Sequence, residues 1–346
     1  MTPTAPWSVE PLQGWHLPLL DDPAFLPLQP LLQRSLLLAL PERLLSSVAH
    51  RQALASQVLV ALRPDPPARP QALGLVMSRR LNRSGTCWQV EHLRLALGAA
   101  EAAASPGRQT IAAGLLREAI RRGRGAASWI ASASGLDVSR LATLRELGFQ
   151  PQRTDHVWRW QPSDAAAPAL PAELQLRQLN RRTAALLWHL EQAACPAQLR
   201  QLLDRRIEDL LDQSGGRGWM LVDSSRNEAV AGVRWQADHP AGGQMVELSL
   251  HPGWGHLLGT PTELLLSRLA GSGGVLWLHS EVGDDARRSW LEALGAETHG
   301  EQVLMARSVW RRQEWQPTRS AARRLGAVLE QFQPRRRPLP TPAGQR

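Results

Sequence analysis

The chain contains no lysine and no tyrosine, so all 40 of its Lys-plus-Arg side chains are arginines. Cysteine is almost as scarce: Cys87 and Cys195 lie far apart and give neither a metal-ligand spacing nor a disulfide framework. No run approaches the roughly 20 apolar residues that a membrane span needs, and residues 1–10 lack the basic region and apolar core of a secretory signal. These absences favour a cytoplasmic protein without a metal or a membrane segment.

Positive charge is concentrated toward the C-terminal end. The formal net charge is +9, and residues 311–346 hold nine arginines and two glutamates, a charge of +7 that leaves +2 for the other residues. The folded part is therefore not expected to bind nucleic acid through its overall charge. Within a basic tail at 313–346, residues 320–332 are predicted to form an amphipathic helix and 333–346 to be disordered. A contact of residues 335–337 with nucleic acid or an acidic partner is the alternative function for this tail.

The length of 346 residues suffices for two domains. An Ala/Pro-rich linker at 163–171 marks the boundary, with a first domain at 1–162 and a second at 172–312. Both are predicted to follow one order of elements: strand, helices, strands, loop, helix, strand, helix, strand. The sequences also agree locally, because 90–93 (VEHL) matches 246–249 (VELS) and 144–148 (LRELG) matches 291–295 (LEALG). We interpret this as a tandem duplication of one α/β unit, the alternative being a chance recurrence of strands and helices.

Periodicity and turn residues predict the individual elements. In the first domain, strands are expected at 15–20, 58–62, 72–78, 87–97, 127–132 and 155–160, and helices at 24–50, after the loop at 105–112, and at 138–147. In the second domain, strands are expected at 174–179, 219–223, 229–236, 244–250, 275–279 and 302–309, and helices at 181–194, 196–211, 260–270 and 284–294.

The stretch 105–149 is the centre of this pattern. A loop of small residues opens a helix, whose first backbone N–H groups can bind phosphate oxygens. A buried strand follows, and then a helix that ends at Leu147-Gly148-Phe149. This order resembles the acyl-CoA-binding half of the GNAT N-acetyltransferase superfamily, and the resemblance covers 58–160 and 174–309.

The resemblance implies an α/β protein of two tandem GNAT-like acyl-CoA N-acyltransferase domains, each a mixed, mostly antiparallel sheet flanked by helices. It also implies acetyl transfer from acetyl-CoA, as cosubstrate, to an amine of a small molecule, a protein N-terminus or a lysine. A catalytically degenerate GNAT-like fold that serves as a binding or scaffold protein is the alternative.

In this family the pyrophosphate of acyl-CoA sits on a loop with the pattern Gln/Arg-x-x-Gly-x-Gly/Ala. By helix phase, Thr110 and Ala112 take the small positions and Gly107 falls where Gln or Arg is expected, with Arg108 one residue on. A shifted register, Gln109-x-x-Ala112-x-Gly114, fits the letters better but misplaces the apolar face of the helix. Arg108, Gln109, Thr110 and Ala112 are therefore candidate cofactor-binding residues, the alternative being an ordinary helix start without a ligand.

The second copy of this loop departs further from the family pattern. It contains Gly259 at the right position, but Pro261 has no N–H to donate and is what an ordinary first helical turn selects. The first repeat is therefore the better candidate for binding the cofactor. Leu95 and Leu250, near the ends of the strands before the two loops, complete the set of candidates.

Asp137 is a further cofactor candidate, because the resemblance places it where the family often has Asn. Asp137 and its counterpart Asp284 are also good residues for capping the helices that follow, which is the alternative role.

Acyl transfer to an amine needs a base for the amine proton and an acid for the leaving thiolate. Family members often carry a Glu on the strand before the loop, and Glu91 and Glu247 occupy that strand in the two repeats. A carboxylate facing solvent, or one paired with arginine, is the alternative for each, and the neighbouring His92 is another candidate base. The tyrosine that often acts as the acid has no counterpart, because Leu144 and Leu291 hold its position.

Overall fold

The computed structural model describes residues 7–45, 56–64, 70–97, 107–123, 125–162, 170–271 and 273–308. Most of the predicted linker at 163–171 and the whole predicted basic tail at 313–346 lie outside these residues. No helix in the described part is long and apolar enough to cross a membrane.

The first repeat consists of the following elements: β1 (Ser8–Pro11), the 3₁₀ helices η1 (Gly14–Leu19) and η2 (Leu26–Leu28), α1 (Gln29–Leu45), β2 (Gln57–Arg63), β3 (Gln71–Arg80), β4 (Cys87–Leu95), α2 (Arg108–Arg122), β5 (Ser128–Ser134), α3 (Val138–Glu146) and β6 (Gln150–Trp160). The strand expected at 15–20 is wrong. Gly14–Leu19 forms a 3₁₀ helix that contains Pro18 and buries His16, and the first strand lies earlier in the chain.

The second repeat consists of β7 (Leu174–Gln178), α4 (Ala184–Ala194), α5 (Ala197–Leu203), α6 (Ile207–Ser214), β8 (Gly218–Asp223), β9 (Glu228–Asp238), β10 (Gln244–Leu250), the 3₁₀ helix η4 (Pro252–Leu257), α7 (Thr260–Ala270), β11 (Leu276–Glu281), α8 (Asp285–Ala293) and β12 (Glu297–Ser308). The helix expected at 196–211 is two helices, because Asp204 takes a left-handed conformation (φ 44°) after α5. The predicted order of elements is otherwise confirmed in both repeats.

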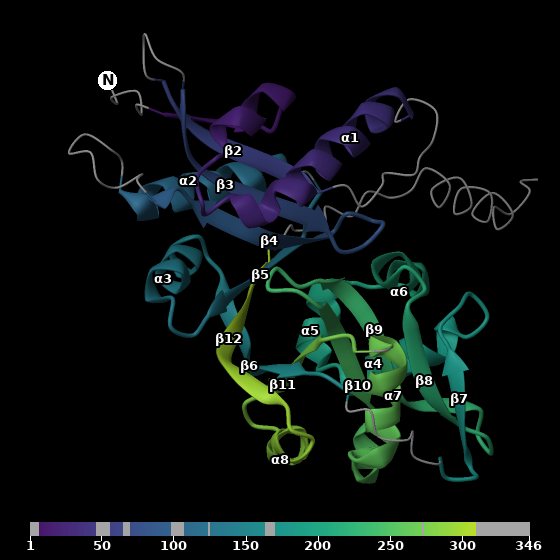
Figure 1. The fold of residues 1–346 in the computed structure, drawn as a ribbon. Helices are drawn as coiled ribbons and strands as arrows, with labels where there is room; N and C mark the ends of the chain where they lie inside the picture. Colours follow the sequence, from purple (N-terminus) through teal and green to yellow (C-terminus); the bar gives the residue numbers. More distant parts are fainter. Residues whose placement is uncertain are drawn as a thin grey trace, which may run out of the picture. The chain divides into compact units, whose positions relative to one another are not determined.

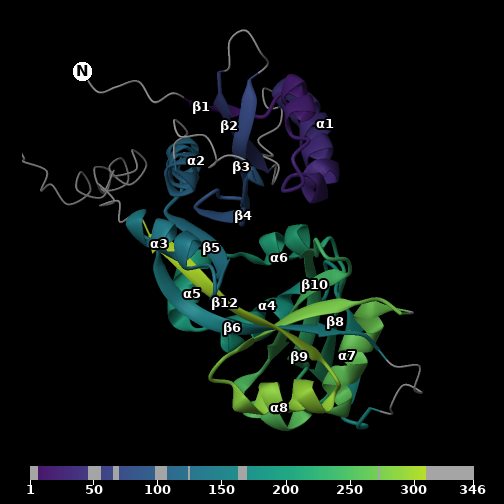
Figure 2. The same cartoon turned by 60° about the vertical axis from the view of Figure 1, so that its left-hand side comes forward.

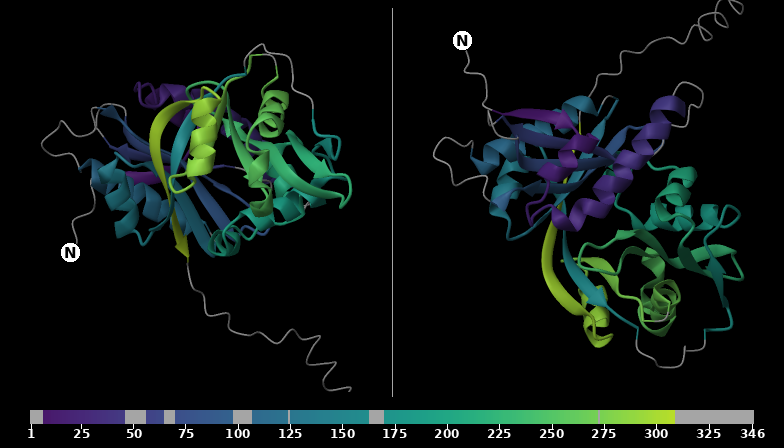
Figure 3. Two further views of the ribbon diagram at one scale, coloured as in Figure 1. Left: turned by 90° about the horizontal axis from the view of Figure 1, so that it is seen from below. Right: turned by 45° about the horizontal axis from the view of Figure 1, so that its top comes forward.

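The strands form one 12-stranded sheet in which the last strands of the two repeats are exchanged. The order is β1-β2-β3-β4-β5-β12-β6-β11-β10-β9-β8-β7. β12, the last strand of the second repeat, pairs with β5 of the first repeat, and β6 pairs with β11 of the second. β6 and β12 also pair with each other. Figures 1 and 2 show β12, in yellow, running beside β6 to the strands of the first repeat, and Figure 3 shows the same strand from two further directions.

The hydrophobic cores record the same exchange. Met305 of β12 is fully buried in the core of the first repeat, with Phe149, Trp129 and the leucines of α2. Trp158 and Trp160 of β6 are buried in the core of the second repeat, and the Trp158 Nε1–H donates to Ser280 Oγ at 2.8 Å. Large aromatic side chains supply much of the apolar area of a core, so each repeat depends on a strand of the other for its packing.

Corresponding helices of the two repeats begin and end in the same way. Asp137 and Asp284 cap α3 and α8 by accepting the backbone N–H groups of Arg140 and Arg287, at 2.9 and 3.0 Å. The capping role is thus confirmed for both aspartates.

Each of these two helices ends at a glycine of positive φ, Gly148 (82°) or Gly295 (78°). In both, the N–H of the residue after the glycine donates to the carbonyl five residues earlier, Phe149 to Leu144 and Ala296 to Leu291, both at 3.0 Å. Only glycine adopts this left-handed conformation without strain.

Two notches open in the sheet where parallel strands part. β4 and β5 pair over four positions, ending with Val90 opposite Ala131, and then diverge. β10 and β11 pair over two positions, ending with Met245 opposite Trp277. We call the gap beyond Val90 the first notch and the gap beyond Met245 the second notch.

The strand exchange leads to a direct test. Ser134 of β5 lies opposite Gln302 of β12, and Cα atoms facing each other across an antiparallel pair are about 4.5–5.5 Å apart, within disulfide range. We therefore expect the double variant Ser134→Cys/Gln302→Cys to form a disulfide on mild oxidation, detected by peptide mapping under non-reducing conditions. In the control Ser134→Cys/Thr154→Cys, the second cysteine is on β6, one strand farther away, and no cross-link is expected. A cross-link in the control and none in the first variant would show that the strands are not exchanged.

Candidate functional site

Both notches open into one cavity, whose volume is about 580 Å³. From the first notch it is lined by Glu91 and His92 of β4 and by Ser132 and Ser134 of β5. From the second it is lined by Glu247 and Leu250 of β10 and by His279 and Glu281 of β11. Residues of β6, β12 and the helices α4 and α5 close the remaining walls. The volume is within the range of small-molecule sites.

Glu91 is held at the edge of the first notch by a neighbouring strand. Its Oε1 pairs with Arg79 Nε of β3 at 2.8 Å, and its Oε2 accepts a hydrogen bond from Ser56 Oγ at 3.3 Å. Burial raises the pKa of Glu91, and the charge of Arg79 and the bond from Ser56 only partly oppose that effect. The result is a carboxyl whose conjugate base is stronger than that of an exposed glutamate.

His92, next to Glu91, is a neutral imidazole. Burial, followed by the charges of Arg94, Arg140 and Arg79, lowers the pKa of His92 to about 4. Positive charge therefore prevails around the first notch, where these three arginines are accompanied by the carboxylates of Glu91 and, beside Arg140, Asp137.

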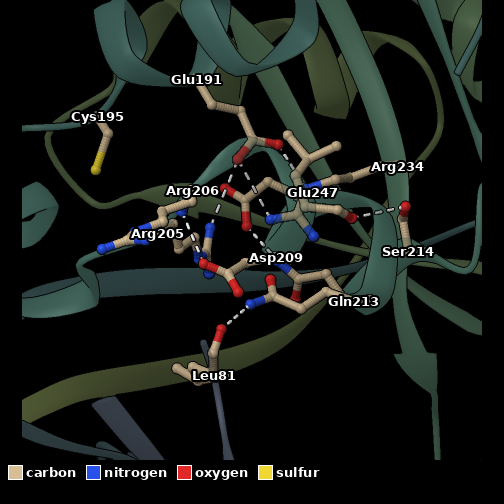
Figure 4. A network of polar contacts seen from close by, with 12 residues as sticks. Leu81, Glu191, Cys195, Arg205, Arg206, Asp209, Gln213, Ser214, Arg234 and Glu247 are labelled. Carbon is tan, nitrogen blue, oxygen red and sulfur yellow. Dashed lines mark hydrogen bonds and ion pairs between the residues drawn. The ribbon is translucent and has the colours of Figure 1, made fainter. Parts of the chain in front are cut away.

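The second notch contains a balanced network of buried charges. Glu191 of α4 pairs with Arg234 Nε of β9 at 2.5 Å and with Arg205 Nη1 at 3.5 Å. Figure 4 shows Glu191 and Glu247 directed toward this same pair of guanidinium groups. Arg234 is only 1% exposed. Such charges are tolerated away from water because each has a partner of opposite sign.

Glu247 belongs to this network and differs from Glu91 in its ionisation. Its Oε2 accepts a hydrogen bond from Gln236 Nε2. Burial raises the pKa of Glu247, but the charges of Arg234, Arg153 and Arg205 together outweigh burial and lower it overall. Glu247 is therefore a stabilised carboxylate with little tendency to take a proton.

The turn between β3 and β4 joins the first repeat to α5 and α6 of the second. Arg83 makes a two-point ion pair with Asp212, at 2.6 and 2.9 Å, and its backbone N–H donates to Asp209 Oδ1 at 2.7 Å. Asn82 donates to the carbonyls of Leu203 and Asp204 at 3.2 and 3.1 Å. This contact holds α5 and Arg205 against the strands of the first notch.

The structure brings together three of the predicted site residues. Glu91, Glu247 and Leu250 all line the cavity, whereas the other predicted residues are not among those that line it. Arg108 is the first residue of α2, where its Nη1 donates to the carbonyl of Ala96 at 2.8 Å, Gln109 and Thr110 are exposed, and Ala112 is buried against the core. Leu95 packs against the same core, and Asp137 caps α3.

The helix start of the second repeat satisfies its own polar groups. Gly259 precedes α7 with φ 150°, and its N–H donates to Thr262 Oγ1 at 3.0 Å. With Pro261 in the same turn, this helix end offers fewer free N–H donors than an ordinary one. The predicted binding role of Gly259 therefore has no support from its hydrogen bonds.

Sequence reasoning missed most of the charged residues of the cavity. Arg234 had a detectable signal, because an arginine directly follows the apolar run 229–233 on a buried strand. Glu191, Arg205 and Arg153 had none, since they are distant in sequence and meet only through the folding of α4 and the exchange of β6.

The comparisons with known proteins show the fold. No protein-family model and no curated protein matches the chain in sequence. A GCN5-related N-acetyltransferase from Sphaerobacter thermophilus superposes with a TM-score of 0.54 at 14% identity, covering 88% of this chain and 97% of that one. A tandem GNAT protein from the clavulanic acid biosynthesis pathway gives 0.54 at 15% identity, covering 87% and 98%. A Drosophila protein gives 0.51 at 15% identity, covering 87% and 98%. The chain therefore has the tandem GNAT fold, as the sequence predicted.

The charge network of the second notch gives a stability prediction. Glu191→Gln leaves Arg205 and Arg234 without their closest carboxylate, and removal of one partner from a buried pair costs about 3–5 kcal/mol. We expect a loss of this size in urea unfolding at pH 7. Glu146→Gln, which breaks the exposed pair with Arg117, is the matched control and should cost less than about 1 kcal/mol. Equal losses in the two variants would contradict the buried network.

Proposed function

We propose that the protein is an acyl-CoA-dependent N-acyltransferase that moves an acetyl group from acetyl-CoA to an amine, with the cosubstrate in the first notch. The observation that carries this proposal is the parting of β4 and β5 beside Glu91. Beyond Val90 and Ala131 the facing edges of these strands have no strand partner among the described residues. Backbone N–H and C=O groups there can pair with an extended chain that carries amides, as the pantetheine arm of acetyl-CoA does.

The two notches differ in whether a side chain already forms a hydrogen bond with the backbone of the parted strands. Arg287 of α8 donates from Nη1 to the carbonyl of Leu248 at 3.1 Å, so it occupies a backbone acceptor of β10 beyond the point of parting. Arg140 holds the same position on α3, three residues after the capping aspartate, and no bond from it to β4 occurs in the described part of the chain. The first notch therefore keeps its backbone groups available, which favours it over the second.

Glu91 is the proposed general base. The amine nitrogen attacks the thioester carbonyl and loses its proton to the Glu91 carboxylate. The carbon–sulfur bond then breaks to release the CoA thiolate, which takes a proton from solvent water. The raised pKa of Glu91 makes it a better proton acceptor than Glu247, whose pKa is lowered. Glu247 then contributes negative charge to the cavity and does not take the proton.

A second candidate function is binding without turnover. It is favoured by Leu144, which is 1% exposed and holds the position where the family resemblance places an acid. An acetyl-CoA site with no acetylation of any amine in a broad panel would support this candidate over the enzyme.

The location of the cosubstrate can be tested by isothermal titration with acetyl-CoA. We expect one site per chain, because Arg287 already occupies a backbone acceptor of β10 in the second notch. Ser132→Trp on β5 should abolish binding by filling the first notch, whereas the matched His279→Trp on β11 should leave it, with thermal unfolding used to confirm that both variants fold. Two sites per chain, or binding that persists in Ser132→Trp, would exclude this location.

Replacing the proposed base should reduce turnover and not cosubstrate binding. For Glu91→Gln we expect kcat/KM for the amine to fall by about 10²–10⁴-fold, with the acetyl-CoA Kd unchanged. In the wild type, kcat/KM should fall as the pH drops through the pKa of Glu91, which burial raises above the usual glutamate range, because the protonated carboxyl cannot accept a proton. Glu146→Gln, on the exposed surface, is the control. Wild-type rates in Glu91→Gln would remove Glu91 from the mechanism.

A further inference from the structure

We infer that the acceptor is a small amine that carries an anionic group, and that Arg94 and Arg140 bind this group beside the first notch. The inference rests on the proposed function, because it names the acceptor class for the same cavity. It is carried by the position of Arg140, by the unequal distribution of charge between the two notches, and by two serines that line the same cavity as the arginines.

Arg140 lacks the partners that its counterpart has. Arg287 pairs with Asp284 Oδ2 at 3.3 Å and bonds the Leu248 carbonyl. Arg140 lines the cavity, and its guanidinium forms neither an ion pair nor a hydrogen bond to a backbone carbonyl within the described residues. The Nε atoms of both arginines are buried without a hydrogen-bond partner, so the two differ in the ion pair and in the carbonyl bond. Asp137 accepts the backbone N–H of Arg140 instead. A partly buried cation that forms no ion pair is costly, and the charge of Asp137 offsets that cost only in part. The arrangement therefore points to an anion that is supplied from outside.

Arg94 adds a second positive charge at the same place. It lines the cavity from β4 and forms no ion pair with any carboxylate in the described part of the chain. Burial and then the charge of Arg94 lower the pKa of Arg140, and the charge of Asp137 opposes them only in part. Glu91, the carboxylate of β4 in the first notch, is already paired with Arg79.

Hydroxyl donors complete the site. Along β5 the side chains alternate, with Ala131 and Ala133 buried in the core of the first repeat and Ser132 and Ser134 lining the cavity. Guanidinium groups and hydroxyls together are the donors that carboxylates and phosphates accept from. The second notch has His279 and Glu281 at the corresponding positions of β11, so it does not offer the same surface.

The geometry limits the acceptor to a short molecule. Arg94 lies three residues after Glu91 on β4, about 10 Å along the strand, and both side chains are long enough to reach inward from these ends. An amine separated from its carboxylate or phosphate by a few bonds can therefore place its nitrogen at Glu91 and its anion at Arg94 and Arg140. The cavity volume of about 580 Å³ suits such a molecule.

The phosphates of acetyl-CoA have the same chemistry as a phosphorylated acceptor, so the experiment must separate the two sources. The probe is O-phosphoethanolamine, with ethanolamine as the match that lacks the phosphate, titrated calorimetrically into the full chain with and without saturating CoA. We expect O-phosphoethanolamine to bind in both states and ethanolamine to bind at least about tenfold more weakly, since charge-assisted bonds are lost.

The variants Arg94→Met and Arg140→Met should each weaken O-phosphoethanolamine binding about tenfold or more and leave the Kd for CoA unchanged. Arg288→Met, on the outer side of α8 with an exposed pair to Asp285, is the control and should change neither. Inorganic phosphate should raise the thermal midpoint of the wild type but not that of Arg140→Met, because only a ligand that binds the folded state stabilises it.

The outcomes are distinct. Competition between CoA and O-phosphoethanolamine, with weaker CoA binding in Arg140→Met, would assign the arginines to the cosubstrate and overturn the inference. Unchanged O-phosphoethanolamine binding in both variants would overturn it as well. Binding that depends on Arg94 and Arg140 in a protein that does not bind CoA would support the anion site and refute the proposed function.

Discussion

The exchange of β6 and β12 is the constraint on which the rest of the structure depends. Because β12 lies between β5 and β6, the hydrogen-bonded ladder runs without a break from the first repeat into the second. Met305 contributes to one core and Trp158 and Trp160 to the other, so neither repeat completes its packing with its own chain segment alone. The exchange also sets the relation between the two notches, since each lies one strand beyond the exchanged pair and both face the same cavity.

A shared cavity explains why so much charge can be buried. Arg153 and Asp155 come from the exchanged strand β6, Arg234 from β9 and Glu191 from α4, and the carboxylates of the second notch are matched by these arginines. The Arg83 ion pair with Asp212 keeps α5 and α6 against the first repeat, so Arg205 stays in the network. Desolvation of any one of these groups would be costly alone, and their number in one place follows from two repeats contributing to one space.

The sequence predicted the architecture better than the site. The matches of 90–93 with 246–249 and of 144–148 with 291–295 identified the duplication, because glycine at a helix end and a glutamate on the strand before the loop are local features. The same features predicted that Glu91 and Glu247 lie on the strand before the loop and that Asp137 and Asp284 cap the helices that follow. The exchange of β6 and β12 could not be predicted, since either strand satisfies the alternation of its own repeat. For the same reason, the partners of Glu191 and Arg153 could not be inferred from spacing.

The two repeats differ in the partners of one corresponding arginine, Arg140 in the first and Arg287 in the second. Both place an arginine three residues after a capping aspartate, where it faces the notch. In the second repeat Arg287 pairs with Asp284 and donates to the Leu248 carbonyl, and the carboxylates around it are matched. In the first repeat Arg140 has no such partner, and Arg94 adds to its charge. An arginine that bonds to groups of the protein stabilises the wall of the cavity, whereas one without such partners can donate hydrogen bonds to a ligand. This difference in satisfied hydrogen bonds, more than any difference in backbone, separates the supporting repeat from the one that offers a binding site.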